Sequence, residues 1–464
     1  MEKRKPRIGI LALMLEDYLP LFEGIREKQT AYVEEVLTSL DGLADFRFPH
    51  VAMNRAEMEE LVHAYNAEGL DGILIFLLTY AQGMYLVHAV QDNRLPLALA
   101  LIQPEQTVRR DFVELDYTVN QGIHGSQDCV NSMLRAGARL EIFAGNRMDA
   151  SFRTFVRDFS VAAMTRTELR AMRIGVIGKL PAMGDVFTDD MAIHRVLGPE
   201  LRYDSIGTVY HHCAAVTEEA VSEAVAEDCR RYVIDPGMPA EVHREAARMY
   251  LGLKAYLEAG GYAGYTLHYG ECGEDGRFTQ LPLLAASNLM ADGYGYAAEG
   301  DSPAAVLTAA MHSLYGDADF SEMYMMDFAR EAILFAHQGE GNPNFCRRDK
   351  KPFLKNRILS EGGLSNPPTP IFTPEPGRAM VLSIVHLGGD RFRMLCMRGD
   401  ILEEDGLLYV DMPYLFFRPD GGVSASVTRW LQLGGTHHEA IVSGDDVRRL
   451  EMLCAMLGVE LEKI

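Results

Sequence analysis

The sequence contains no apolar run long enough to cross a membrane. A spanning helix needs about 20 consecutive apolar residues, whereas the first apolar stretch, 8–15, is short and leads directly into Glu16 and Asp17. A basic start followed by so short a stretch is a poor signal peptide and a good first strand. We therefore expect no membrane partner and no secretory leader.

Basic residues are in the minority. The chain has 44 Lys and Arg against 66 Asp and Glu, which gives a formal net charge of −22 over 464 residues. A surface that follows nucleic acid phosphates is basic, so this balance argues against nucleic acid as a partner. It leaves the identity of any small-molecule ligand open.

Cysteine is scarce and is not clustered. The seven cysteines are dispersed along the chain without a C-x-x-C pair. This pattern is not typical of a thiolate metal site, and a chain of this length needs no disulfide bonds to hold a core. We expect mostly buried thiols and a cytoplasmic location.

Glycine-rich phosphate-binding motifs are missing where they would follow a strand. No glycine cluster follows the strand expected at 7–14, and the stretch 178–184 after the strand expected at 172–177 is not G-x-G-x-x-G. A Walker A motif is absent as well. These absences argue against a nucleotide-dependent dehydrogenase or kinase.

Two parts of the chain alternate between strand and helix patterns. Near-continuous apolar runs at 7–14 and 70–78 are separated by segments with helical spacing, and the alternation restarts at 172–177. Buried strands that alternate with amphipathic helices are typical of a parallel sheet covered on both faces. We expect an α/β chain that begins with two doubly wound, Rossmann- or flavodoxin-like domains, at 1–165 and 166–315.

The last third of the chain has a different pattern. A Pro-rich connector at 364–377 is followed by strand-like runs at 380–386, 392–398 and 406–413. Successive short runs of this kind favour an antiparallel sheet. We expect a mostly antiparallel β domain at 316–464.

Two glutamates stand in contexts that permit a site. Glu299 lies between Ala298 and Gly300, which leave room for a ligand, and Glu322 is flanked by apolar and aromatic residues. A carboxylate among apolar residues is paired, protonated, bound to a metal or turned to solvent. Taken alone, each glutamate is more simply explained as a solvated side chain.

Histidines could complete a mixed site. His337 ends an apolar run and precedes Glu340. Two adjacent histidines, His437 and His438, lie in a Gly-Gly loop. Carboxylates combined with imidazoles suit Mn²⁺, Fe²⁺, Zn²⁺ or Co²⁺. The adjacent pair at 211–212 lacks acidic neighbours and is interpreted as structural; for His337 alone, a structural role is also the simpler interpretation.

These stretches resemble the L-arabinose isomerases and the wider arabinose/fucose isomerase superfamily. Residues 289–301 (LMADGYGYAAEGD) are close to the family's LMADGYGFGAEGD, 320–324 (FSEMY) correspond to F-M-E-D-Y, and 434–438 (GGTHH) resemble GGAHH. Residues 332–343 are similar to a strand that ends in a metal-ligating histidine, and 120–125 (NQGIHG) resemble NQTAHG. The similarity covers nearly the whole chain, with its specific motifs mainly at 120–125 and 285–438.

The resemblance implies a divalent-metal-dependent aldose–ketose sugar isomerase, typically with Mn²⁺. In such an enzyme the metal stabilises an enediolate while a carboxylate moves a proton between C1 and C2. Carried onto this sequence, the family pattern makes Glu299 and Glu322 catalytic, and it gives the metal ligands Glu299, Glu322, His337 and His438.

The resemblance also implies contacts outside the metal ligands. His124 would touch the sugar from a neighbouring subunit, and Met183 would line the substrate pocket. Glu340 and His437 are the expected neighbours that support the ligands. The family pattern is a homotrimer or homohexamer with active sites between subunits.

Several pocket segments depart from the family pattern. Residues 12–19 (ALMLEDYL) stand where the family has TGSQHLYG, and 79–84 (TYAQGM) replace a segment like FSPAKM. In the Glu322 element, Met323 and Asp327 replace an Asp and a His. Because the expected metal ligands are retained and pocket residues are not, the substrate is less defined than the reaction class.

Two alternatives therefore accompany the expected isomerase. One is a divergent isomerase or epimerase that acts on another aldose, a deoxy sugar or a sugar acid. The other is a non-catalytic sugar-binding protein on the same scaffold, which the four expected metal ligands argue against because binding alone does not need them.

Overall fold

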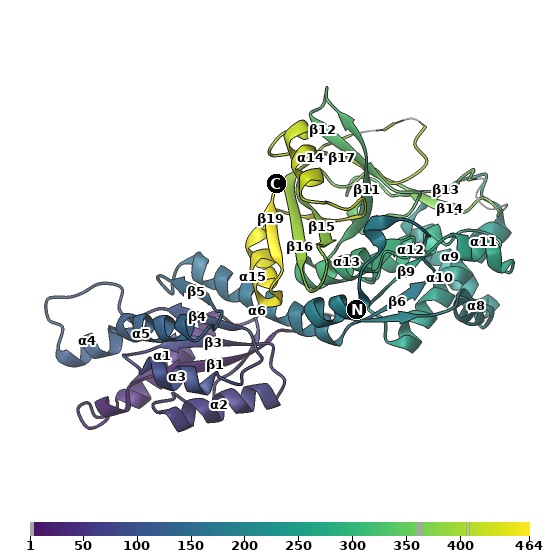
Figure 1. Cartoon of the computed structure of the whole chain (residues 1–464). Coiled ribbons are helices and arrows are strands. Elements are labelled where there is room, and N and C mark those ends of the chain that lie inside the picture. Colours follow the sequence, from purple (N-terminus) through teal and green to yellow (C-terminus); the bar gives the residue numbers. More distant parts are fainter. Residues whose placement is uncertain (1–3, 360–363, 405, 408) are drawn as a thin grey trace. The chain divides into compact units, whose positions relative to one another are not determined.

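The computed structural model describes residues 4–359, 364–404, 406–407 and 409–464 (Figure 1). The chain divides into two compact units. One contains the residues up to Thr167 together with Arg448–Met456, and the other contains Glu168–Val447 and Leu457–Ile464. The predicted boundaries at 165 and 315 of a three-domain chain stay a prediction.

The N-terminal unit is built on a five-stranded parallel sheet. Its strand order is β2-β1-β3-β4-β5, with the bounds β1 Arg7–Leu13, β2 Asp45–Arg47, β3 Gly72–Leu77, β4 Leu97–Leu101 and β5 Glu141–Ala144. The main helices that follow its strands are α1 Ile25–Ser39, α2 Arg55–Ala67, α3 Gly83–Ala89, α4 Glu114–Asn120, α5 Gly122–Arg135 and α6 Ala150–Ala171. This unit confirms the predicted first parallel α/β sheet.

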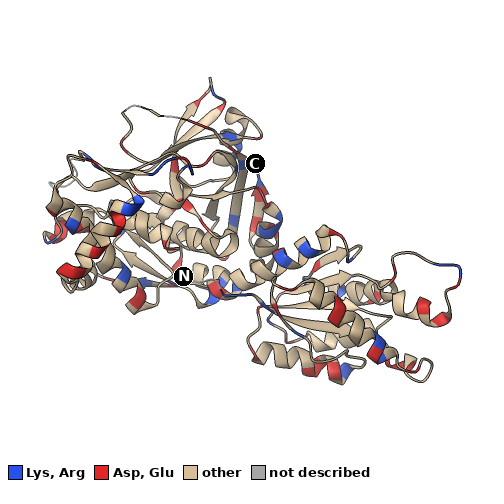
Figure 2. Cartoon of the chain, turned by 180° about the vertical axis from the view of Figure 1, so that it is seen from behind, with Lys and Arg blue, Asp and Glu red and all other residues tan. Residues whose placement is uncertain are grey.

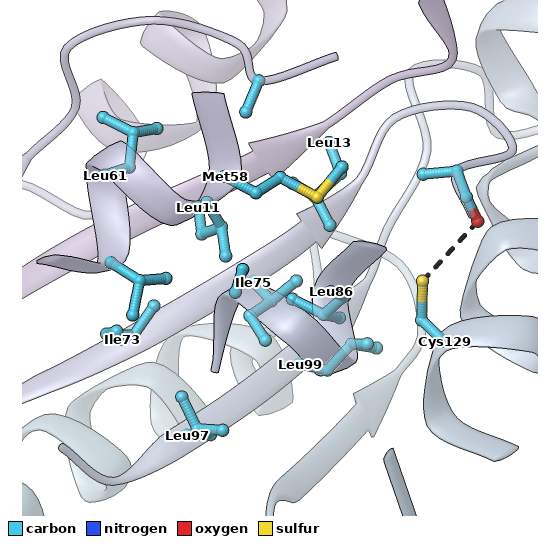
Figure 3. Close-up of a cluster of buried hydrophobic side chains, with 14 of the residues drawn as sticks. Leu11, Leu13, Met58, Leu61, Ile73, Ile75, Leu86, Leu97, Leu99 and Cys129 are labelled. Atoms are coloured by element: carbon cyan, nitrogen blue, oxygen red, sulfur yellow. Dashed lines mark hydrogen bonds between the residues drawn. The ribbon is translucent and has the colours of Figure 1, made fainter. Parts of the chain in front are cut away.

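The core of this unit explains the continuous apolar runs. Every residue of β3 is buried, because helices cover both faces of a doubly wound sheet. Figure 3 shows Leu11, Ile75 and Leu99 from neighbouring strands packed with Met58 of α2 and Leu86 of α3.

The second parallel sheet has four strands in the order β10-β9-β6-β7. Their bounds are β6 Arg173–Ile177, β7 Glu200–Tyr203, β9 Gly264–Leu267 and β10 Gly295–Ala298. Its main helices are α8 Ile206–Ala214, α9 Glu218–Arg231, α10 Ala240–Gly260, α12 Leu283–Ala291 and α13 Ser302–Tyr315. Ligands of such sheets bind at the carboxyl ends of the strands, which here lead into residues 178, 204, 268 and 299.

The C-terminal sheet is mostly antiparallel, as predicted, and six of its strands close into a ring. Its order is β15-β18-β11-β12-β17-β16, and β15 also pairs with β16. The bounds are β11 Asp319–Asp327, β12 Ala332–Ala336, β15 Gly377–His386, β16 Phe392–Ile401, β17 Tyr414–Pro419 and β18 Glu439–Ser443, and a seventh strand, β19 Glu460–Lys463, runs parallel to β16. Trp430 on α14, Val423–Gln432, belongs to the apolar core of this barrel.

A three-stranded sheet connects the central and C-terminal sequence. Its order is β14-β13-β8, with β8 Val233–Ile234, β13 Phe353–Asn356 and β14 Pro368–Ile371. β8 comes from the central α/β region and pairs with β13 in parallel. The central and C-terminal parts are therefore hydrogen-bonded to each other through main-chain atoms within one compact unit.

The exposed surface carries charges of both signs. Figure 2 shows acidic and basic residues interspersed along helices and loops of both units. Among the described residues, no helix combines the length and the hydropathy that a membrane crossing requires. Five of the seven cysteines are buried, at positions 129, 213, 272, 396 and 454.

Closure of the barrel depends on close main-chain approach at Gly399. A Cβ atom there would lie 2.1 Å from the Arg418 carbonyl oxygen and 2.7 Å from the Phe417 ring. We expect Gly399→Ala to lower the free energy of unfolding by about 1–3 kcal/mol, the usual cost of overpacking. Urea unfolding followed by the fluorescence of Trp430, the single tryptophan, reports on this barrel directly.

Gly237→Ala is the matched control for this substitution. The nearest atom to a Cβ at Gly237 would be at 3.4 Å, an ordinary contact. The control should shift the free energy of unfolding by no more than about 0.5 kcal/mol. Equal unfolding midpoints for the two variants would contradict the close approach at Gly399.

Candidate metal centre

Strand pairing brings a glutamate between two histidines. In the barrel β11 lies between β12 and β18. Glu322 of β11 pairs with Ala336, so His337 follows directly on one side. Ser321 pairs with Glu439, so His438 precedes β18 directly on the other side. The register of two antiparallel pairs therefore assembles residues that are more than a hundred positions apart in the sequence.

Glu299 reaches the same place from the second parallel sheet. It follows β10 and has a φ of 64°, a left-handed conformation that is uncommon for a residue other than glycine. Gly300 has a φ of 85°, and a Cβ there would lie 2.5 Å from the Gly178 carbonyl oxygen. The turn after β10 is thus held tightly against the loop after β6.

The ligand atoms of Glu322, His337 and His438 lie within 4.8 Å of one another. His438 Nε2 lies 3.3 Å from Glu322 Oε1 and 3.6 Å from Glu299 Oε2. His337 Nε2 lies 3.7 Å from Glu322 Oε1. Ligand atoms that share one metal at about 2.1 Å are themselves about 3–3.5 Å apart, so a small inward movement would complete a coordination sphere.

Two of these atoms lack the partners that buried polar atoms need. Glu299 Oε2 and His438 Nε2 are buried without a hydrogen-bond partner among the described residues. An unsatisfied buried polar group costs about 1–3 kcal/mol, and more when it is charged. Glu299 Oε2 is an acceptor, and His438 Nε2 becomes one when the imidazole is neutral, so these residues fit a divalent metal ion.

Further carboxylates orient the two buried imidazoles. His438 Nδ1 lies 2.9 Å from Asp301 Oδ2, and His337 Nδ1 lies 3.0 Å from Glu340 Oε1. The Tyr296 hydroxyl donates to the same Glu340 oxygen at 2.6 Å. A carboxylate on Nδ1 leaves Nε2 to face a metal and strengthens it as a ligand.

The charges of this cluster follow from its neighbours. Burial raises the pKa of Glu340, but the lowering effects of His337 and Tyr296 together are larger and bring this pKa to about 2. Burial likewise raises the pKa of Glu299, and three histidines bring it below its ordinary value. Burial lowers the pKa of His438, whereas Asp301 and Glu322 raise it to about 9. Glu299 and Glu340 therefore stay ionised at neutral pH.

His437 occupies a different position from His438. Its Nδ1 lies 2.6 Å from Asp185 Oδ2, and its main-chain N–H donates to the same oxygen at 3.1 Å. Its Nε2 is 3.8 Å from both Glu299 Oε2 and Glu322 Oε1, and its side chain is 36% exposed, against 0% for His438. His437, Glu299 and His438 form a second group of possible ligands.

Six of the sequence-predicted residues lie together in this cluster, namely Glu299, Glu322, His337, Glu340, His437 and His438. Met183 is half-buried in the loop after β6, two residues before Asp185. His124 is exposed on α5 of the N-terminal unit. The roles of all these residues stay predictions.

Two aspartates of the cluster were missed by sequence reasoning. Asp301 follows Glu299 by two residues, and its side chain caps α13 by accepting from the Ala304 N–H. An Asp before Ser-Pro is a recognisable N-cap signal, but its second bond, to His438, depends on the barrel. Asp185 had no local signal.

A cavity of about 100 Å³ adjoins Glu299 and His337. It lies beside the carboxyl ends of β9 and β10, next to Leu267 and Ala298. This is the usual location for a ligand of a doubly wound sheet.

Two family models match the chain. The model described as the L-arabinose isomerase central domain matches residues 185–316. The model described as the L-arabinose isomerase C-terminal domain matches residues 317–460. The two matches adjoin and contain all of the clustered side chains.

Similar curated proteins carry the same description. The L-arabinose isomerase of Clostridium beijerinckii is 28% identical over 408 residues, which cover 86% of this chain and 81% of that protein. L-arabinose isomerase 1 of Bacillus licheniformis is 28% identical over 452 residues, covering 95% and 87%. A solute binding protein of Actinobacillus succinogenes with bound D-allose is 13% identical, covers 67% of this chain and 90% of that one, and has a TM-score of 0.17, too low to support any argument.

Mn²⁺ affinity distinguishes the roles of the two adjacent histidines, His437 and His438. We expect His438→Asn to weaken Mn²⁺ binding at least 100-fold, because Nε2 of this buried imidazole faces both glutamates. His437→Asn should weaken it less than 10-fold, since this half-exposed ring is held by Asp185. Titration of the full chain with Mn²⁺, followed by electron paramagnetic resonance of the free ion, measures both.

His212→Asn is the control, because it changes a histidine of the other adjacent pair, on α8. It should bind Mn²⁺ as the unchanged chain does. A larger loss in His437→Asn than in His438→Asn would reverse the assignment, and equal binding by all three variants would refute a metal site here.

Proposed function

The chain belongs to the L-arabinose isomerase family through residues 185–460, and from this premise we propose that it is a divalent-metal-dependent aldose–ketose sugar isomerase. The observation that carries the proposal is a pair of possible ligand groups that share His438. One is Glu322, His337 and His438, the other is Glu299, His437 and His438, and within each group the ligand atoms lie within 4.8 Å of one another. Mn²⁺ is the proposed metal, because the family resemblance implies it and a mixed set of carboxylates and imidazoles is compatible with it.

The reaction removes a proton from one carbon and adds a proton to the neighbouring carbon, so it needs a base and an acid. Isomerisation moves a hydrogen from C2 to C1 of an aldose, and a C–H bond next to a carbonyl does not ionise unaided at neutral pH. A divalent metal held by the four ligands would supply Lewis-acid polarisation of the substrate oxygens.

The two glutamates supply the proton transfer. Because the neighbouring histidines keep the pKa of Glu299 below its ordinary value against the effect of burial, this carboxylate is in its basic form at neutral pH. We assign to Glu299 and Glu322 the removal of the C2 proton and its return to C1, by way of an enediolate, while the O2 hydroxyl proton moves to O1, so that C1 becomes a hydroxymethyl group and C2 the carbonyl. Asp301 and Glu340 hold the imidazoles in orientation during these steps.

The surroundings of the centre extend the proposal. Met183 and a cavity next to Glu299 would contact the sugar. His124 would reach it from a neighbouring copy in a homotrimer or homohexamer, as in the family resemblance, and the proposed location is the cytoplasm. The alternatives are an isomerase or epimerase of another sugar and a sugar-binding protein without turnover.

The test is turnover restored by metal. The full chain is stripped with a chelator, supplied with Mn²⁺ and offered a panel of pentoses, hexoses and deoxy sugars, with ketose formation as the measurement. We expect conversion of at least one sugar with Mn²⁺ and none with chelator. Tight Mn²⁺ binding with no conversion of any sugar would leave a binding protein and refute the isomerase.

Glu299→Gln tests the catalytic assignment. Loss of a general base typically lowers kcat by about 100–10,000-fold, and we expect a decrease in this range because the amide cannot accept the C2 proton. Glu223→Gln on α9 is the control, since this exposed side chain lies on a surface helix. A Glu299→Gln variant with undiminished kcat on the converted sugar would contradict the role of this residue.

A further inference from the structure

The loop after β6 contacts two separate parts of the candidate metal centre. It spans residues 178–186. Near its start, the Leu180 N–H donates to the main-chain carbonyl of Glu299 at 2.9 Å. Near its end, Asp185 contacts His437. Glu299 follows the second parallel sheet and His437 precedes β18 of the barrel, so one short loop is bonded to both halves of the centre.

The main chain of this loop is held in an uncommon conformation. Ala182 has a φ of 65°, a left-handed value that is unfavourable for a residue with a Cβ atom. Such a conformation persists where the surrounding structure enforces it, and it is frequent at functional sites. The contacts here are close, because a Cβ atom at Gly300 would lie 2.6 Å from Lys179 Cα. The path of the loop, and with it the position of Asp185, is therefore set by its neighbours.

Asp185 restrains the imidazole of His437 at two points. Its Oδ2 accepts from the His437 main-chain N–H at 3.1 Å and lies 2.6 Å from Nδ1 of the ring. The contact that one ring nitrogen makes determines what the other nitrogen can do. With Nδ1 engaged by Asp185, Nε2 lies 3.8 Å from Glu299 Oε2 and 3.8 Å from Glu322 Oε1. The ring is thus directed at both carboxylates to which the proton transfer is assigned.

The exposure of this pair suits contact with a substrate. The side chains of Asp185 and His437 are 38% and 36% exposed, whereas His438 is fully buried. The pair also borders a cavity of about 360 Å³, larger than the roughly 150 Å³ that holds a benzene ring. A sugar that approaches the cluster can therefore contact the His437 ring, while the buried histidines stay available to the metal.

We propose that Asp185 is a positioning residue: it holds His437 so that Nε2 contacts a substrate oxygen next to the two catalytic glutamates. Asp185 acts through His437 and need not touch the substrate. The inference rests on the proposed isomerase function and goes beyond it, since that function assigns the metal and the proton transfer to other residues. Because the same loop is bonded to the Glu299 main chain, it also relates the imidazole to one of the two carboxylates.

A double-mutant cycle tests whether Asp185 acts through His437. Asp185→Ala, His437→Asn and the double variant are assayed with the sugar that the Mn²⁺-loaded full chain converts. Each single substitution should lower kcat/KM by about 10–100-fold, the cost of a misplaced group in an active site. In the His437→Asn background, Asp185→Ala should add less than about 2-fold, because residues that act as one unit are not additive. Effects that multiply in the double variant would overturn the proposal.

A conservative variant and a neighbouring aspartate complete this comparison. Asp185→Asn keeps an oxygen that can accept from His437, so its kcat/KM should exceed that of Asp185→Ala by about 3-fold or more. The matched control is Asp189→Ala, whose exposed side chain caps α7, Asp190–Ala192. The control should change kcat/KM less than about 2-fold, and Trp430 fluorescence checks that each variant is folded. Equal losses in Asp189→Ala and Asp185→Ala would show a general effect on the loop and overturn the assignment.

Alditol binding separates this inference from the isomerase function, since it needs no turnover. The Mn²⁺-loaded chain and its variants are titrated calorimetrically with arabinitol, ribitol, xylitol and galactitol. Asp185→Ala and His437→Asn should weaken binding of the tightest alditol by the same factor, about 3–10-fold, the usual effect of one hydrogen bond.

The outcomes of this titration are distinct. Weaker alditol binding in both variants without conversion of any aldose would support the positioning role and refute the isomerase. Conversion of a sugar, with alditol binding and kcat/KM unchanged in Asp185→Ala, would support the isomerase and overturn the positioning role. A loss of Mn²⁺ affinity in Asp185→Ala as large as that in His438→Asn would make His437 a metal ligand and would also overturn it.

Discussion

The position of β11 between β12 and β18 is the constraint on which the metal centre depends. Antiparallel pairing sets Glu322 opposite Ala336 and Ser321 opposite Glu439, so the residues next to those partners, His337 and His438, flank the glutamate. A shift of one residue in either pairing would turn one histidine to the opposite face of the sheet. Closure of the barrel through the β15–β16 pairing removes free strand edges at which such a shift could start.

Electrostatics then determine what this geometry can hold. Glu299, Glu322, Asp301 and Glu340 lie within contact distance of the imidazoles. Four carboxylates in one buried place repel one another unless positive charge lies between them. The carboxylates that raise the pKa of His438 to about 9 also favour a cation at its Nε2, so a metal ion and a proton compete for the same position. Phe320 packs against the rings of His337 and His438, with centroid distances of 4.9 and 5.0 Å. This packing keeps the two imidazoles away from water and strengthens their interactions with the carboxylates.

The parts of this arrangement that the sequence predicted are those with a local pattern. Continuous apolar strands such as β3 identified the parallel sheets. The runs at 380–386 and 392–398, which lie in β15 and β16, identified the antiparallel one, whereas the run expected at 406–413 is not a strand in its described residues. The six clustered residues were named from four of the five motifs, because a resemblance between stretches carries tertiary information that spacing alone lacks. Asp185 was missed because its partner His437 is 252 positions away, and neither residue type nor neighbours mark it. The pairing of β8 with β13 was missed because β8 has only two residues, which leave no periodicity to detect.

The side chains of the candidate metal centre and those that line the adjoining cavity come from different elements of the same unit. Glu322 lies on β11, Glu299 and His337 follow β10 and β12, and His438 precedes β18; the chemistry proposed for them concerns two adjacent oxygens of a sugar. The leucines of the cavity come from β9 and from the start of α12, elements that contribute no ligand. Substitutions in these elements can therefore alter the cavity without disturbing the strand register that assembles the clustered side chains. If the carboxylates and imidazoles act as proposed, divergence of the pocket segments is expected to change the substrate and to leave the proton transfer in place.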